Sequence, residues 1–526
     1  MSATGKIKRA LVSVSDKSGL VDLCRVLDEL EVEIISTGGT LKTLRDAGIH
    51  AVSVSTFTGS PEILDGRVKT LHPKIHAGIL YKRDEQEHIE QMQQADFKGI
   101  DLVIVNLYPF KQTVAKPTAT EEEIVENIDI GGPSMLRAAA KNFPFVTVLC
   151  DPADYPTVLE QIQKNNGSTT AEFRKDCARK VYAHTADYDA AVAAYFDRVM
   201  KPAGSEESKF PRSLQLNYVR ESSLRYGENP HQSASLYGDP AFPAPTLLRA
   251  KILAGKELSY NNYNDLDTCL EMLLDFSEPF SCVLKHANPC GAAVGKTIAE
   301  AYRAAYDSDP LSAYGSIIGL NKEIDMAAAE LLHETPFVEC ILAPSYSAEA
   351  LALLTKKKTR RLLELPDILH GRRKGMMTYR FLQGGLLAQD ADDHVMAQAD
   401  LKVVTKKAPT SDELASLLFA WKVVKHTKSN AIVIARGNAT VGIGMGQTSR
   451  VDSSFLAVKR AGDRAKGAVL ASDAFFPMAD GLQVATDAGV TAVIQPGGSK
   501  GDEEVIAAAD KAGVAMVFTG VRHFKH

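Results

Sequence analysis

The strongest constraint on the fold is an alternation of short apolar runs and helical spacing over residues 9–54. Arg9–Val14, Val32–Ile35 and Ala51–Val54 are the apolar runs, and the leucines between the first two recur at helical spacing. A strand, a helix and a further strand in this order predict a parallel, doubly wound α/β sheet. Asp101–Asn106 and Val146–Cys150 are expected to complete that sheet.

Small hydroxyl-bearing turns follow the first two predicted strands. Ser15–Gly19 and Ser36–Thr40 present backbone N–H groups at the start of a helix, an arrangement that favours a phosphate. Either turn alone is equally compatible with an ordinary helix cap, but two turns on one sheet edge favour an anion site. Neither turn is G-x-G-x-x-G or a Walker loop, so dinucleotides and ATP are poorly supported.

Two later segments of the same region are candidates for function. Gly66–Gly78 contains cationic side chains and two imidazoles without helical or strand periodicity, which predicts a functional loop. Ile128–Ser134 is another glycine turn, and it leads into a helix that contains Arg137 and Lys141. Thr120 and Glu123 have the spacing of a capping box.

The length of 526 residues exceeds a single core, so we expect two to four domains. We predict a first domain over 1–200, a linker over 201–212 and a second domain over 213–526. The second domain shows the order strand, turn, strand, helix, strand twice, about 150 residues apart, which suggests a duplicated three-layer unit. Its halves are placed at 213–365 and 426–526, and the segment between them, including the helix Ser411–Lys425, is interpreted as an insertion.

Val283–Gly291 carries the clearest chemistry of the second domain. An apolar run ends at Lys285 and His286, and Asn288-Pro289 then turns the chain. An imidazole suits general acid-base work, and an adjacent ammonium stabilises developing negative charge. A solvated strand end is the alternative. Ser223–Gln232 is predicted to be a binding loop, with a structural turn as the alternative.

Composition excludes several classes of protein. A net charge of −5 and a pI near 6.3 give no electrostatic footprint for nucleic acid. No apolar run approaches the ~20 residues of a membrane span, and the N-terminus lacks the apolar segment of a signal peptide. The seven cysteines contain no C-x-x-C, so we expect reduced thiols in a cytoplasmic protein.

Nine segments, in this order along essentially the whole chain, closely resemble one family, the bifunctional AICAR transformylase/IMP cyclohydrolase of purine biosynthesis. They are V-S-V-S-D-K-S-G-L, I-S-T-G-G-T, G-R-V-K-T-L-H-P-K-I-H-A-G-I-L, N-L-Y-P-F, N-I-D-I-G-G-P-S-M-L-R-A-A-A-K-N, L-R-Y-G-E-N-P-H-Q, L-K-H-A-N-P-C-G, G-Q-T-S-R and R-H-F-K-H.

The resemblance implies a methylglyoxal-synthase-like N-terminal domain that cyclises formyl-AICAR to IMP. It also implies a C-terminal transformylase of two cytidine-deaminase-like halves, with 10-formyltetrahydrofolate as co-substrate. No catalytic metal is expected, because the H-x-E and P-C-x-x-C zinc signature is missing. A homodimer with transformylase sites between subunits is implied, and a structural monovalent cation is left open.

The resemblance assigns roles to individual residues of the transformylase. His286 would be the base, Lys285 would stabilise the oxyanion or relay a proton, and Asn430 would orient the histidine. The positions that would hold AICAR are Arg225, Tyr226, Gly315, Glu339, Arg450, Phe475 and Arg522, and those that would contact folate are Asp480, Ser499 and Lys500. Met478 stands where the family commonly has phenylalanine, which puts only local folate packing in doubt.

For the cyclohydrolase, the resemblance implies acid-base and polarising roles for Lys69, Tyr108, Asp129 and Lys141, with Lys141 the favoured proton carrier. The ribotide would be held by Ser13, Ser15, Lys17, Ser36, Thr37, Gly38, Gly39, Thr40, Arg67, Thr70, Asn106, Ile130, Gly131 and Gly132. Two rivals are a single-activity enzyme with one decayed site and a nucleotide-sensing protein with inert copies of these domains. The presence of every residue assigned above argues against the first rival, and retention of Lys285, His286, Lys69 and Lys141 disfavours the second.

Overall fold

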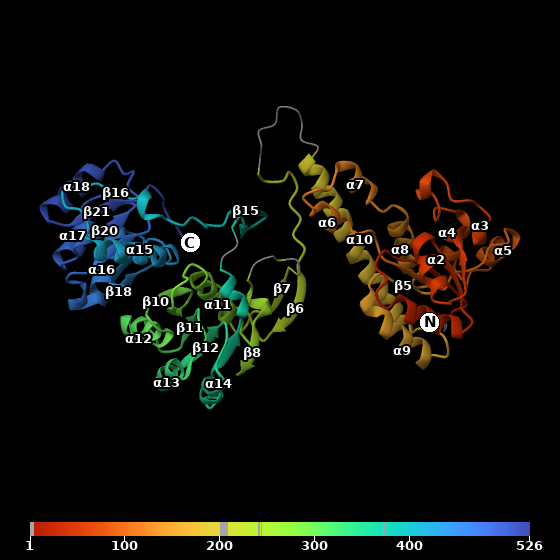
Figure 1. Ribbon diagram of the computed structural model, residues 1–526, viewed down its shortest axis with the longest axis horizontal. Coiled ribbons are helices and arrows are strands. Elements are labelled where there is room, and N and C mark those ends of the chain that lie inside the picture. Colours follow the sequence, from red (N-terminus) through yellow and green to blue (C-terminus); the bar gives the residue numbers. More distant parts are fainter. Residues whose placement is uncertain (1–4, 200–208, 240–241, 243–244, 372–373) are drawn as a thin grey trace. The chain divides into compact units, whose positions relative to one another are not determined.

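The computed structural model describes residues 5–199, 209–239, 242, 245–371 and 374–526, and it divides after Asn217 into two compact units (Figure 1). The division lies five residues beyond the end of the predicted linker, most of which (201–208) falls outside the described residues. Among the described helices, none is both long and apolar enough to cross a membrane.

A five-stranded sheet in the order β3-β2-β1-β4-β5 forms the centre of the N-terminal unit. The strands are β1 (Arg9–Ser13), β2 (Glu33–Ser36), β3 (Ala51–Ser53), β4 (Leu102–Val105) and β5 (Thr147–Leu149). All four pairings are parallel, as predicted, so every strand delivers its carboxyl end to the same edge. The apolar runs of β1 and β4 are buried because helices cover both faces of such a sheet.

The helices of this unit are α1 (Leu20–Glu29), α2 (Gly38–Asp46), α3 (Val54–Thr58), α4 (Pro73–Leu80), α5 (Gln86–Gln94), α6 (Phe110–Val114), α7 (Glu121–Glu126), α8 (Gly131–Lys141), α9 (Tyr155–Lys164) and α10 (Ala171–Val199). The capping box of Thr120 and Glu123 opens α7 as predicted. The expectation of a loop throughout Gly66–Gly78 is wrong in its second half. Pro73 occupies the first turn of α4, and the Lys74 amide donates to Nδ1 of His72 at 3.1 Å.

A twelve-stranded mixed sheet runs through the C-terminal unit, in the order β16-β21-β20-β19-β17-β18-β10-β9-β11-β12-β13-β8. Its strands are β8 (Lys251–Ala254), β9 (Phe280–Lys285), β10 (Asn288–Val294), β11 (Ser316–Leu320), β12 (Val338–Ala343), β13 (Arg361–Glu364), β16 (Lys402–Val403), β17 (Ile432–Arg436), β18 (Ala439–Gly444), β19 (Val469–Ser472), β20 (Ala492–Gln495) and β21 (Ala515–Phe518). From the antiparallel β10–β18 pair at its centre, the sheet has the same order in both directions: the other strand of a hairpin, followed by four further strands.

This arrangement confirms the duplicated three-layer unit. β9 begins at 280 and β17 at 432, while β13 begins at 361 and β21 at 515, so equivalent elements are 152 and 154 residues apart. On one face of the sheet, α11 (Tyr260–Leu273) and α15 (Ser411–Lys425) share a single apolar core. The other face is covered by α12 (Ile298–Ser308), α13 (Met326–Glu334), α14 (Ala348–Leu354), α16 (Arg450–Ala461), α17 (Asp480–Asp487) and α18 (Asp502–Lys511).

The helix Ser411–Lys425 therefore does not belong to an insertion. As α15 it is the counterpart of α11, because each precedes the hairpin of its own half and each is opened by a capping box. The separate hairpin β14 (Met377–Leu382) and β15 (Gly385–Asp390) does lie between the halves (Figure 1). A second hairpin, β6 (Val219–Leu224) and β7 (Ala234–Gly238), contains most of the predicted binding loop in its connection.

The last residues of the chain are docked against the second half of this unit. His523 is buried, and its amide donates to the Asp473 carbonyl at 3.0 Å. The Ser429 amide donates to the Lys525 carbonyl at 2.9 Å, and the Lys525 amide donates to Oγ of Ser429 at 3.1 Å. The basic-aromatic tail is therefore part of the folded domain.

Candidate active sites

A cavity of about 650 Å³ opens at the carboxyl edge of the N-terminal sheet. It collects residues that follow β1, β2 and β4 and residues that open α8, as a parallel sheet requires. The predicted site residues that line it are Ser13, Ser15, Lys17, Thr37, Gly38, Gly39, Thr40, Arg67, Lys69, Thr70, Asn106, Tyr108, Asp129, Ile130, Gly131 and Gly132.

Hydrogen bonds between the strand ends shape one wall of the cavity. The Ser13 and Thr37 hydroxyls lie 2.7 Å apart, and the Thr40 hydroxyl donates to the Val14 carbonyl at 3.0 Å. The Asn106 side chain accepts from the Ser15 amide at 2.6 Å and donates to the Asp16 carbonyl at 2.8 Å. The turn after β1 is therefore held to the end of β4.

Two helices start at this cavity without a side-chain cap. The residues that precede α2 and α8 are Thr37 and Ile130, and neither makes a capping hydrogen bond. The first amides of α2 and the Gly131 amide of α8 are therefore available to an anion, and the helix dipoles favour negative charge there. The Gly132 amide is bound by Asp129, and Pro133 has no N–H. Gly132 permits this geometry, because a Cβ at that position would lie 2.5 Å from Oδ2 of Asp129 and 2.7 Å from Leu107.

Asp129 is the carboxylate best placed for acid-base work in this cavity. Its Oδ1 accepts the Gly132 amide at 2.7 Å, and its own amide donates to the Tyr188 hydroxyl at 2.8 Å. Burial raises the pKa of Asp129, while the amides of Gly132 and Tyr108 and the charge of Lys69 oppose that rise. Lys69 and Asp129 thus form an electrostatically coupled pair on one cavity wall.

Two predicted residues do not line this cavity. Ser36 is fully buried, and its hydroxyl donates to the Val12 carbonyl at 2.8 Å, so its side chain ties β2 to β1. Lys141 is exposed at the far end of α8, about 15 Å along the helix from Gly131 at 1.5 Å per residue. Its role as proton carrier stays a prediction.

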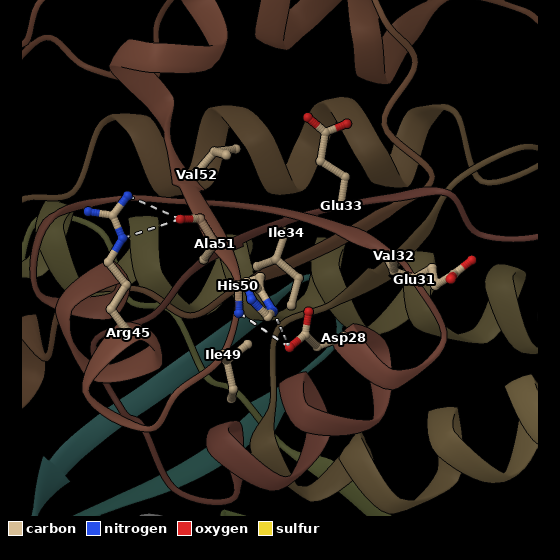
Figure 2. A pocket seen from close by; sticks show the side chains of 10 residues that line it. All are labelled: Asp28, Glu31, Val32, Glu33, Ile34, Arg45, Ile49, His50, Ala51 and Val52. Atoms are coloured by element: carbon tan, nitrogen blue, oxygen red, sulfur yellow. Dashed lines mark hydrogen bonds and ion pairs between the residues drawn. The ribbon is translucent and has the colours of Figure 1, made fainter.

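A hollow of about 510 Å³ lies around the amino ends of β2 and β3, away from the strand ends that line the site (Figure 2). Its polar groups bind one another: Asp28 accepts from both the amide and the ring of His50, and Arg45 donates to the Ala51 carbonyl. No helix begins there with free amides among these lining residues. The carboxyl edge is therefore the better candidate for a phosphate.

In the C-terminal unit, Lys285 ends β9 and His286 forms the turn to β10. His286 and Ala287 have φ values of 55° and 53°, as the two central residues of a tight hairpin turn do. The His286 side chain is exposed. The Ala287 amide donates to Oδ1 of Asp265 at 2.7 Å, which fixes the turn to α11. Lys285 Nζ donates to the Tyr314 carbonyl at 2.9 Å, beside Gly315.

The buried Arg450 and the partly buried Asn430 form a polar cluster next to this turn. Arg450 donates to Oδ1 of Asn430 at 2.7 Å and to Oδ1 of Asp473 at 2.5 Å. The Lys428 amide donates to Oδ1 of Asn288 at 3.0 Å, and Asn288 Nδ2 donates to the His286 carbonyl at 3.2 Å. Asn430 is thus connected through the backbone to the His286 turn, whereas Arg450 is already engaged by protein groups.

The remaining predicted transformylase residues are distributed around the unit. Arg225 lies over the Tyr226 ring at 4.8 Å in the β6–β7 connection, and Glu339 pairs with Arg361 at 2.7 Å. Arg522 stacks on Phe524 at 4.2 Å, and Gly501, beside Ser499 and Lys500, packs against the Pro477 carbonyl. Phe475, Met478 and Asp480 are exposed. None of the predicted transformylase residues lines one of the four cavities described among these residues.

Comparison with known proteins identifies the family. A family described as AICARFT/IMPCHase bienzyme matches residues 139–460, and one described as MGS-like domain matches residues 19–134. The chain belongs to the AICARFT/IMPCHase bienzyme family. The family named by the sequence resemblance is thereby confirmed, and with it the two activities in the description, AICAR transformylase and IMP cyclohydrolase.

Relatives of the bienzyme match along its whole length. "Bifunctional purine biosynthesis protein PurH" of Anoxybacillus flavithermus is 50% identical over 519 residues, and that of Halalkalibacterium halodurans 52% identical over 519. The protein of the same name from Bacillus subtilis is 51% identical over 520 residues. Each alignment covers 99% of this chain and 100% of the relative.

Sequence reasoning missed several groups of the bienzyme's sites. Asp265 and Asp473 hold the His286 turn and Arg450, yet each stands in a segment without a motif of its own. Glu126 pairs with Arg67 at the cavity, but nothing in the sequence distinguishes it from the other glutamates of α7. Within the described ranges, no three or more His, Cys, Asp and Glu side chains are grouped to hold a metal ion.

Proposed function

We propose that this bienzyme transfers a formyl group from 10-formyltetrahydrofolate to the 5-amino group of AICAR and then cyclises the formyl-AICAR to IMP, serving purine biosynthesis as its relatives' names indicate. The first reaction takes place around His286 and the second in the N-terminal cavity. One observation best supports assigning one reaction to each unit: each unit contains its own set of acid-base groups at strand ends.

In the transfer step, the amine nitrogen of AICAR attacks the formyl carbon of the folate. The exposed imidazole of His286 takes the proton that the amine loses, and the folate nitrogen leaves with a proton. Lys285 stands beside His286 at the end of β9, where its ammonium stabilises the oxyanion of the tetrahedral intermediate. The hydrogen bond from Lys285 to the Tyr314 carbonyl holds that ammonium beside Gly315.

Arg450 is proposed here as a positioning residue as well as a ligand of the AICAR phosphate. Its guanidinium is buried and binds Asn430, Asp473 and Ser472. Contact with the phosphate therefore requires the outer edge of the guanidinium, and Arg225 and Arg522, which are exposed, supply the remaining charge.

The cyclisation is intramolecular: the carboxamide nitrogen attacks the new formyl carbonyl, and water leaves. Proximity is supplied by the substrate, so the cavity has to fix a rotamer and move protons. The phosphate binds at the uncapped start of α2, near Ser13, Thr37 and Lys17. Lys69, Tyr108 and Asp129 then surround the reacting groups, while Lys141, outside the cavity, remains the proton carrier proposed from the resemblance.

The bienzyme is further proposed to be a cytoplasmic homodimer whose transformylase sites are completed by the partner subunit. This proposal rests on the family resemblance, and one observation supports it: the predicted transformylase residues line none of the four cavities described in the chain. The same resemblance leaves room for a structural monovalent cation.

One assay tests the proposed function. Purified protein is supplied with AICAR and 10-formyltetrahydrofolate, and formyl-AICAR and IMP are followed separately. Both species are expected to form in succession. Folate-dependent loss of AICAR without IMP would instead establish a single-activity enzyme, and binding of AICAR without turnover would establish a nucleotide sensor.

A further inference from the structure

A third cavity, of about 620 Å³, lies in the C-terminal unit between the start of the first hairpin and α15. Its walls include the aromatic side chains Phe276, Phe419 and Trp421, with Asn438 at its edge. The two-site mechanism above uses none of these residues.

The duplication gives this cavity a definite position in the fold. Asn430 stands two residues before β17, and Glu278 stands two residues before β9. Likewise His286 and Ala287 form the turn of the first hairpin, and Gly437 and Asn438 form the turn of the second. The Val294 amide donates to the Asn438 carbonyl at 2.9 Å. The cavity is therefore the counterpart, in the other half, of the His286 site, with glycine in place of the imidazole.

The charges of the cavity balance. Three lysines, Lys374, Lys422 and Lys425, and three carboxylates, Asp275, Glu278 and Asp393, line it. Asp275 is bound by Lys425 at 3.1 Å and by His426 at 2.8 Å, and all three side chains are nearly buried. Because no single sign is in excess, the cavity offers no net attraction to a strongly charged ligand such as a phosphate.

The uncharged part of the cavity favours a flat ring. Phe276 and Phe419, whose ring centres are 6.0 Å apart, line the cavity together, and Phe276 is held in place by stacking on Phe280 at 3.8 Å. Lys422 Nζ lies 4.9 Å from the Phe276 ring centre. The indole nitrogen of Trp421 is buried without a hydrogen-bond partner among the described residues. Buried polar groups of this kind are normally satisfied, so this one marks an incomplete site.

We propose that this cavity binds a neutral, fused heteroaromatic base that carries a lactam, of the purine or pteridine type. The aromatic side chains provide the stacking surface. Lys422 donates to the ring carbonyl, Glu278 accepts from a ring N–H or amino group, and Asn438 serves either. The inference does not depend on the roles proposed for His286 or Asp129.

The chain contains a single tryptophan, so intrinsic indole fluorescence reports on this cavity alone. Guanosine, which lacks the phosphate that the two ribotide sites require, is titrated onto the full-length protein, and pterin is used in a second arm. A saturable change of indole fluorescence with either probe is expected. The arm that responds identifies the ring type, and no saturable change with either probe overturns the proposal.

Matched variants locate the binding. Lys422→Met should weaken binding about tenfold, since it removes one charge-assisted hydrogen bond. Lys459→Met, on α16 across the sheet, should leave binding unchanged, as should His286→Ala. Equal affinities of Lys422→Met and Lys459→Met, or loss of binding in His286→Ala, overturn the proposal. Circular dichroism checks folding, and Asn438→Ala in the exposed turn replaces Lys422→Met if that variant unfolds.

Discussion

The two units of the chain arrange their predicted site residues in different ways. In the N-terminal unit, the strand ends of one parallel sheet place nearly all the predicted residues around a single cavity. In the C-terminal unit, the predicted residues occur at a hairpin turn, a buried arginine cluster, strand β12 and several separate loops. A parallel sheet gathers its loops at one edge, whereas a duplicated mixed sheet distributes them, so the predicted transformylase residues do not meet at one of the described cavities.

The first prediction separates the two sites by removing the imidazole. His286→Ala should lower formyl transfer by roughly 10²–10⁴-fold, the usual contribution of a general base, and leave cyclisation of supplied formyl-AICAR unchanged. Both rates are measured on the same preparation. His370→Ala, an exposed histidine of the same unit, is the control and should alter neither rate. If both activities of His286→Ala fall together while the fold survives, the two-site assignment is wrong.

The second prediction concerns the enclosed site. Lys69→Met should reduce cyclisation by about 100-fold and leave formyl transfer intact, because it removes the cation that faces Asp129 in the cavity. Lys141→Met is measured in parallel and should also stall the reaction at formyl-AICAR if the resemblance assigns it correctly. If Lys141→Met forms IMP as fast as the wild type, Lys141 has no part in the mechanism. Its exposed position at the end of α8 would agree with that result.

Dilution tests whether only one of the two sites depends on a partner. As the protein is diluted through its dimer dissociation constant, the specific activity of formyl transfer should fall about tenfold or more, since its residues do not enclose a site in the described chain. Cyclisation should fall little. Sedimentation at matching concentrations supplies the oligomeric state. Specific activities that decline in parallel, or a transfer rate that persists in the monomer, would contradict shared sites.

Close packing at the enclosed site gives a stability prediction. Gly132→Ala should destabilise the N-terminal unit by about 1–3 kcal/mol, the usual cost of overpacking, because the added methyl would meet Asp129 and Leu107. Gly39→Ala is the matched control, since its Cβ would contact nothing within 4 Å. Denaturant unfolding measures both. An equal stability of the two variants would show that the α8 start has room for a side chain.

Sequence patterns predicted which residues gather at the N-terminal cavity, but not how those of the C-terminal unit are arranged, for physical reasons. The strands and glycine turns of the N-terminal unit are local features, and a parallel sheet fixes where their ends meet. The pairing of Arg450 with Asp473 joins segments 23 residues apart, and no periodicity encodes it. Two elements were misassigned. The region of α4 was predicted as loop because the helix begins at a proline, and α15 was predicted as part of an insertion because it follows the β14–β15 hairpin, which lies between the two halves.

The smallest predicted effect concerns the coupling of Asp129 to pH. Burial raises its pKa, so the folded protein holds this proton more tightly than the unfolded chain, whose carboxyl titrates near 3.8. Its contribution to stability is therefore complete below pH 3.8 and is lost as the pH rises through the folded pKa. Asp129→Asn keeps an oxygen for the Gly132 amide but removes the buried charge. The variant should melt about 2–4 °C above the wild type at pH 7, with the difference vanishing in acid. If the melting temperature of Asp129→Asn exceeds that of the wild type by the same amount at pH 3 and pH 7, burial of the Asp129 charge is not the cause of the difference.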